Sequence, residues 1–127
     1  MKRIMKTDQV CGTDGTWAQA IQGGNMLFIS GQVGTDAKGD LVGADFASQA
    51  KQALENLRLL LEAGGATLED LAMITVLVTD MKNRPAFAKI RSEYFLENPP
   101  ASTIVEISQL YAPEVLIEIN GIAVLEA

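Results

Sequence analysis

Acidic residues near the end of the chain have the clearest potential for acid–base chemistry. The sequence has no histidine and a single cysteine, Cys11, which excludes imidazole bases, His-ligated metals and Cys-rich zinc sites. Glu118 lies inside an apolar run, where burial would raise its pKa toward the range of a general acid or base. Its alternation with isoleucines equally fits a side chain that faces water. Glu106 lies in the preceding run, and its pairing with Glu118 is a weak signal. We expect no metal and no cofactor.

Four other residues are candidates for binding a small polar ligand. Ser30 ends an apolar run, and Gly31 next to it would let a ligand approach backbone N–H and C=O groups. The hydroxyl of Ser102 could bind a ligand or cap local backbone. Trp17, the one tryptophan, either lines a pocket or fills the core. Considered alone, Ser30 and Gly31 are better explained as an ordinary strand end, and a lone aromatic residue such as Trp17 is more often part of the core.

The elements that position these residues follow from hydrophobic periodicity. Asp45 is a predicted N-cap, and apolar residues then recur at helical spacing until Gly64 and Gly65 end the helix. A capping-box spacing at Thr67 predicts a short helical turn, and Pro85 suits the first turn of a second helix. Strands are expected at residues 16–20, 26–30, 73–79, 103–107 and 115–125, with a further candidate at 2–6, and a Gly-rich turn at residues 23–25 joins the first two of these into a hairpin.

This order of elements indicates one domain, residues 1–127, with helices packed on one face of a sheet. Several strands carry apolar residues on both faces. A monomer would leave one such face in water, so we expect that oligomerisation covers it.

The overall charge bears on partners and location. Lys and Arg number 10 against 16 Asp and Glu, giving a net charge of −6, which disfavours nucleic acid as a partner. No stretch approaches the length of a membrane span. The basic N-terminal residues are not followed by an apolar run, as a signal peptide would require. We therefore expect a cytoplasmic protein that does not associate with membranes.

Several motifs, in their order along the chain, resemble those of the RidA (YjgF) family. They are residues 25–33 (NMLFISGQV), 49–57 (QAKQALENL), 76–81 (VLVTDM), 100–107 (PASTIVEI) and 117–124 (IEINGIAV). The similarity extends over nearly the whole chain, and on this basis the sequence is identified as a member of the family.

The resemblance implies an α+β fold like that of Bacillus-type chorismate mutase, with a mixed sheet backed by two helices on one face. It also implies a homotrimer with clefts between subunits, and hydrolysis of reactive enamines and imines to keto acids and ammonia. By resemblance, Glu118 places or activates water, Trp17 is the cleft aromatic residue, and Ser30 with Gly31 lies at the strand end. Backbone groups of Ile104 bind the substrate. The last two strands of that fold are not neighbours, which weakens the carboxylate pairing.

One residue departs from the family pattern. Where the family has Pro-Ala-Arg, this chain reads Pro100-Ala101-Ser102, and a serine cannot make the bidentate contact of an arginine with a carboxylate. The chain thus resembles the arginine-lacking members. By resemblance, Arg91 falls at a polar, cleft-facing position of the second helix. It is either a substitute cation or a solvated surface residue.

These observations leave three functions open. The first is hydrolysis of an imine or enamine, and the second is binding of a small metabolite without catalysis, which the missing arginine favours. The third is a role on RNA, which the acidic charge disfavours. The expected partners are a small-molecule ligand and further copies of the chain in a homotrimer.

Overall fold

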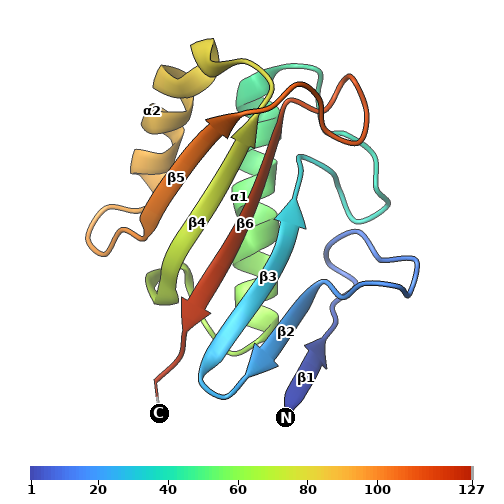
Figure 1. Ribbon diagram of the computed structural model, residues 1–127, viewed down its shortest axis with the longest axis vertical. Helices are drawn as coiled ribbons and strands as arrows, with labels where there is room; N and C mark the ends of the chain where they lie inside the picture. The colour runs from blue at the N-terminus through green and yellow to red at the C-terminus, as the bar shows by residue number, and fades with distance from the viewer. Residues whose placement is uncertain (127) are drawn as a thin grey trace.

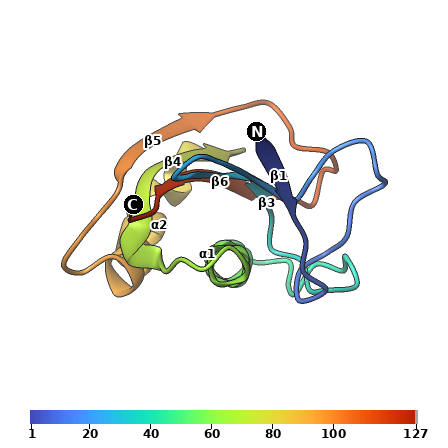
Figure 2. The ribbon, with the colours of Figure 1, turned by 90° about the horizontal axis from the view of Figure 1, so that it is seen from below.

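The computed structural model describes residues 1–126, and its core is one mixed sheet with two helices on one side. Among these residues the strand order is β1-β2-β3-β6-β4-β5. The β4–β5 pair is parallel, and the other neighbouring pairs are antiparallel. Figures 1 and 2 show the sheet arching over both helices, which confirms the predicted α+β class. The elements are β1 (Lys2–Met5), β2 (Ala20–Gly23), β3 (Met26–Gln32), α1 (Phe46–Ala63), η1 (Leu68–Asp70), β4 (Leu71–Val78), η2 (Met81–Asn83), α2 (Arg84–Tyr94), β5 (Ala101–Glu106) and β6 (Ile117–Val124).

Helix α1 begins and ends where the sequence predicts. The Asp45 side chain accepts a hydrogen bond from the Ser48 backbone N–H at 2.9 Å, and the helix ends before Gly64, with Gly65 at φ +80°. One face of α1 is fully buried, including Leu54, Leu57, Leu60 and Leu61. Burial of each leucine contributes about 1.5–3 kcal/mol, so this face anchors the sheet to the helix.

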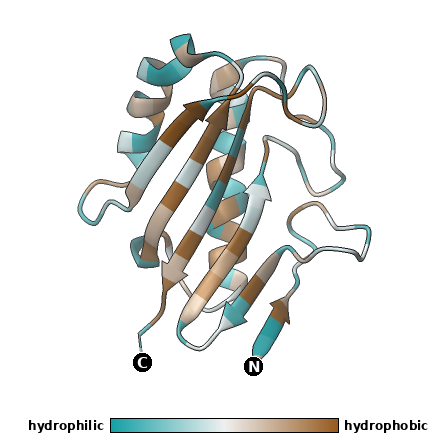
Figure 3. Cartoon of the chain, viewed as in Figure 1, coloured by the Kyte–Doolittle hydropathy of each residue, from teal (hydrophilic) through white to brown (hydrophobic). Residues whose placement is uncertain are grey.

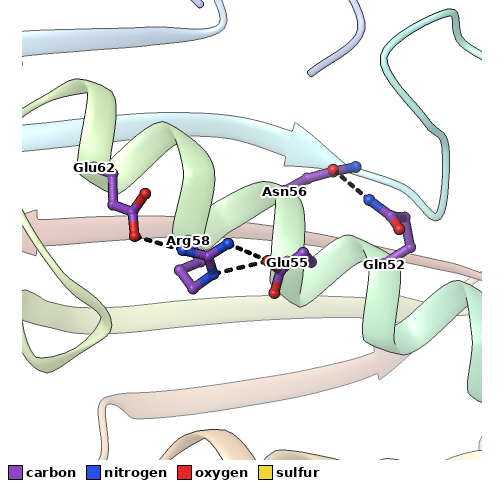
Figure 4. A network of polar contacts seen from close by, with 5 residues as sticks. All are labelled: Gln52, Glu55, Asn56, Arg58 and Glu62. Carbon is purple, nitrogen blue, oxygen red and sulfur yellow. Dashed lines mark hydrogen bonds and ion pairs between the residues drawn. The ribbon is translucent and has the colours of Figure 1, made fainter. Parts of the chain in front are cut away.

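Helix α1 also carries polar side-chain contacts, several of which Figure 4 shows. Arg58 pairs with Glu55 and Glu62 at helical spacing. Such partly exposed pairs contribute little stability. Asn56 accepts a hydrogen bond from Gln52, and its own amide donates to the carbonyl groups of residues 33 and 35 at 3.0 Å. Asn56 therefore holds the chain just beyond β3.

Gln49 ties two loops to α1 from inside the protein. Its buried amide nitrogen donates to the carbonyl oxygens of Gly43 and Glu114, both at 3.0 Å. Its oxygen accepts from the Leu116 N–H at 2.9 Å. Because Leu116 immediately precedes β6, these bonds fix the position at which that strand starts.

The strand predicted at residues 16–20 is wrong in its extent. The strand begins only at Ala20. Upstream, one Asp14 carboxylate oxygen accepts hydrogen bonds from both the N–H and the hydroxyl of Thr16. This local turn competes with strand pairing. The predicted hairpin after Ala20 is confirmed, with Gly24 at φ +58° in its turn.

The sheet face opposite the helices carries exposed apolar side chains. Phe28, Met73, Val105 and Val124 are each 38–43% exposed. Residues next to three of them in the strands are buried in the core, namely Leu27, Ile29, Ile74 and Ala123. In Figure 3, which views this face, hydrophobic residues run along the central strands. A sheet that is apolar on both faces is typical of a protein that covers the second face with another chain.

No helix in residues 1–126 combines the length and the apolar character that a membrane crossing needs.

Candidate functional site

Glu118 lies on the sheet face opposite the helices, against the backbone of Gly31. In β6 the isoleucines on either side of Glu118 are fully buried, so Glu118 points the other way. It pairs with Leu77 of β4 on one side. On the other side, a Cβ built on Gly31 would clash with the carboxyl group of Glu118. Any larger residue at position 31 would therefore displace the carboxyl group.

Burial alone perturbs the Glu118 carboxyl group. Its side chain is half-buried, and the resulting loss of solvation raises its pKa above the usual glutamate value. Within residues 1–126 no Lys or Arg forms an ion pair with it. A carboxyl group in this state can accept and return a proton closer to neutral pH than an exposed glutamate can.

Trp17 and Ser30 lie in a second part of the candidate site. Ser30 is the residue before Gly31 in the sequence. They line a cavity of about 980 Å³ formed largely by the N-terminal segment. Trp17 is 48% exposed, so it lines this cavity and does not fill the core. The Ser30 hydroxyl donates to the Ala18 carbonyl at 2.6 Å, which holds the segment that carries Trp17. Ser30 lines this cavity and immediately precedes Gly31, the residue that Glu118 contacts, although Glu118 itself is not among the lining residues.

A different cavity, of about 540 Å³, lies between α2 and β5. Arg91, Ser102 and Ile104 all line it. The Arg91 guanidinium donates a hydrogen bond to the Ser102 hydroxyl at 3.2 Å and stands 5.5 Å from the centroid of the Phe87 ring. This stacking and hydrogen bonding direct the cation into the cavity.

The residues singled out in the sequence thus form two groups on opposite faces of the sheet. Ser102 and Ile104 pair with the buried Ile74 and Val76 of β4, so they share the face that carries the helices. Glu118 occupies the other face. The cavity beside β5 also includes Arg84, which the sequence analysis missed. Its spacing of seven residues from Arg91 on a helix was the available signal.

The sheet does not pair the two carboxylates of the last strands. β4 lies between β5 and β6, as the family resemblance implied. The Glu106 carboxylate instead accepts a hydrogen bond from the Met81 backbone N–H at 2.8 Å, at the start of η2. This contact gives Glu106 a structural role at the end of β4.

Comparison with known proteins identifies the family. The family described as Endoribonuclease L-PSP matches residues 8–125. The chain belongs to the RidA/YjgF/L-PSP family. It is 41% identical to a RutC family protein of Pyrococcus horikoshii over 99% of this chain and 100% of that protein. It is 35% identical to the 2-iminobutanoate/2-iminopropanoate deaminase of Escherichia coli, with 98% of each chain covered.

Solved structures agree with this assignment. RidA from an Antarctic Psychrobacter superposes with a TM-score of 0.91 at 30% identity, covering 97% of this chain and 99% of that one. E. coli TdcF, crystallised with bound serine, gives a TM-score of 0.90 at 28% identity, covering 98% and 99%. The fold and its chorismate-mutase-like arrangement are therefore those of RidA proteins.

Proposed function

We propose that this RidA-family protein hydrolyses the C=N bond of a small anionic imine, or of an enamine that tautomerises to one. The observation that carries the proposal is the half-buried Glu118 carboxyl group, unpaired within residues 1–126 and held against the backbone of Gly31. Relatives named as imine deaminases support the reaction class.

The complete site forms between two chains of a homotrimer. The apolar outer face of the sheet supports assembly, since Phe28, Val105 and their neighbours gain burial when a second copy covers them. The separation of the two residue groups supports a shared site. One chain offers Trp17 and Glu118, and the next offers Arg91 with Ser102.

The chemistry follows from these groups. Arg91, steadied by Ser102, binds the anionic group of the substrate through charge-assisted hydrogen bonds. The substrate reacts as its protonated iminium form. The Glu118 carboxylate takes a proton from water as the water oxygen bonds to the imine carbon, and the C=N double bond becomes a single bond to a neutral amine. The protonated Glu118 then passes this proton to the amine nitrogen of the carbinolamine. Finally the Glu118 carboxylate takes the hydroxyl proton while the C=O bond forms and the C–N bond breaks, so that a keto acid and ammonia leave and Glu118 releases its proton to solvent. A raised pKa suits these proton transfers.

Binding without catalysis is the second candidate. The specific observation behind it is Ser102, which stands where the family resemblance places an arginine and which cannot replace it as a cation. In that case the chain would bind a metabolite and leave it unchanged.

Turnover assays separate the two candidates. We expect wild-type protein to accelerate the disappearance of freshly generated 2-iminobutanoate above its spontaneous hydrolysis, and Glu118→Gln to lose about 100-fold or more of that rate. Glu69→Gln, an exposed glutamate on η1, is the matched control and should keep full activity. Equal activity of Glu118→Gln and wild type would contradict the proposed role. Ligand binding with no turnover by the wild type would favour the second candidate.

A further inference from the structure

A second arginine lines the cavity that holds Arg91. Arg84 and Arg91 both belong to α2 and are seven residues apart, so they lie on one side of the helix, roughly 10 Å apart along its axis. Both line the cavity of about 540 Å³ between α2 and β5, two elements that lie side by side at the edge of the molecule (Figure 1). The cavity therefore has a cation at each of two positions along its length.

These two charges are not neutralised by the protein itself. Neither Asp nor Glu lines the cavity. Within residues 1–126, the side-chain ion pairs of the chain involve Arg58, and neither Arg84 nor Arg91 takes part in one. A concave site with two unpaired guanidinium groups is unusual in a chain whose net charge is −6. The positive electrostatic potential in this cavity attracts anions more strongly than the rest of the protein surface does.

Helix stability does not account for Arg84. It is the first residue of α2, and no acidic residue occupies the first turn. The positive end of the helix dipole lies there, so a cation is locally unfavourable.

The wall between the arginines is apolar. Phe87, which lies between them on α2 and is 1% exposed, lines the cavity, and so does Ile104 of β5. A ligand that reached both arginines would place its central part against these side chains. An aliphatic chain suits that environment, because it needs no hydrogen-bond partner.

The geometry points to a dianionic ligand, an imino or keto dicarboxylate whose two acid groups are joined by a short aliphatic chain. One acid group binds Arg91 and Ser102, and the other binds Arg84. This inference rests on the proposed function, in which Arg91 binds one anionic group of the substrate. The inference adds a second anionic group, which Arg84 binds. A monoanion would leave the Arg84 guanidinium uncompensated, so the second acid group gains a further charge-assisted contact.

Calorimetric titration of matched keto acids tests the inference. 2-Oxoglutarate and 2-oxopentanoate have the same number of carbon atoms, and only the first has a second carboxylate. We expect wild-type protein to bind 2-oxoglutarate about tenfold tighter, equivalent to ~1.4 kcal/mol. The pair 2-oxoadipate and 2-oxohexanoate repeats the comparison with one more methylene, and a preference for the dianion in either pair supports the inference.

Three variants assign the contacts. Arg84→Gln should remove the preference for the dianion and leave the affinity for the monoanions unchanged, while Arg91→Gln should weaken both kinds of ligand. Lys89→Gln is the control, since Lys89 is an exposed cation of the same helix that does not line the cavity. Each variant should keep the wild-type mass in light scattering and the wild-type melting temperature.

Two results would overturn the inference while leaving the proposed function intact. They are equal wild-type affinities within both pairs, and a preference that survives in Arg84→Gln. If wild-type protein binds none of the four acids, the anion site at Arg91 fails as well, and the proposed function falls with it.

Discussion

At the scale of single residues, the contact between Glu118 and Gly31 is the most informative feature. The carboxyl group lies so close to the glycine backbone that position 31 cannot carry a side chain without moving it. Burial raises the pKa of the same group. A charge kept in such a place costs stability, which is typical of a residue retained for function.

The substitution Gly31→Ala should lower imine hydrolysis by roughly tenfold or more, because its Cβ would displace a group that must be placed precisely enough to reach water. The measurement is kcat/KM with an imine generated in the assay. Gly23→Ala is the control, because a Cβ at Gly23 would make only an ordinary contact with Phe28, at 3.8 Å, and Gly23 lines neither of the two cavities. If both variants match wild type, the contact at Gly31 has no part in catalysis.

The raised pKa of Glu118 also predicts how stability depends on pH. The folded protein holds the Glu118 proton more tightly than the unfolded chain does, so this carboxyl group destabilises the fold as pH rises from the unfolded pKa through the folded one. Glu118→Gln should therefore melt at a higher temperature than wild type at pH 8, and the difference should vanish near pH 3. Melting curves at fixed protein concentration measure it. A difference that does not change with pH would refute the assignment.

At the scale of elements, the position of α2 next to β5 determines where a positively charged side chain lies in the cavity between them. β5 carries Ser102 at the position where the family resemblance places an arginine. Arg91 of α2 reaches the same place, since its guanidinium donates to the Ser102 hydroxyl at 3.2 Å. The helix thus supplies a charge that the strand lacks.

This arrangement predicts what happens when the arginine is placed on β5, at position 102, in addition to or in place of Arg91 on α2. Ser102→Arg alone should gain little activity on 2-aminoacrylate, because its guanidinium would meet that of Arg91. Arg91→Ala should lose activity, and adding Ser102→Arg to it should restore about tenfold in kcat/KM. Lys89→Ala serves as the control for charge on the same helix. Failure of the double variant to exceed Arg91→Ala, with the fold intact, would show that the two positions do not share a role.

At the scale of the whole molecule, the uncovered sheet face predicts assembly. We expect light scattering at micromolar concentration to give three times 13.6 kDa, the mass of one chain. Phe28→Asp should disrupt the trimer, because it places a charge on the outer face. Val42→Asp is the control: Val42 is also 43% exposed but lies in the loop between β3 and α1. If the wild-type protein is monomeric, both the proposed trimer and the proposed site between two chains are wrong.

Much of the fold was predictable because its signals are local. The Asp45 cap, the leucine spacing of α1 and the glycines that end it act within a few residues of one another, and the helix has the predicted bounds. The hairpin turn at Gly24 is equally local. Five short motifs, in their order along nearly the whole chain, were sufficient to identify the family. The exception at residues 16–20 is local too, since the side chain of Asp14 outcompeted strand pairing.

The site itself depended on contacts between distant parts of the chain. Only the strand order inserts β4 between β5 and β6, which separates Glu106 from Glu118. Only the packing of α2 on β5 brings Arg91 to Ser102 and adds Arg84 to the same cavity. The sequence determined which residues could do chemistry, because residue type and near neighbours set that. The tertiary structure decided which of these residues lie close together. Strand pairing and helix packing bring together segments that are far apart in the sequence, and sequence separation does not predict distance in space.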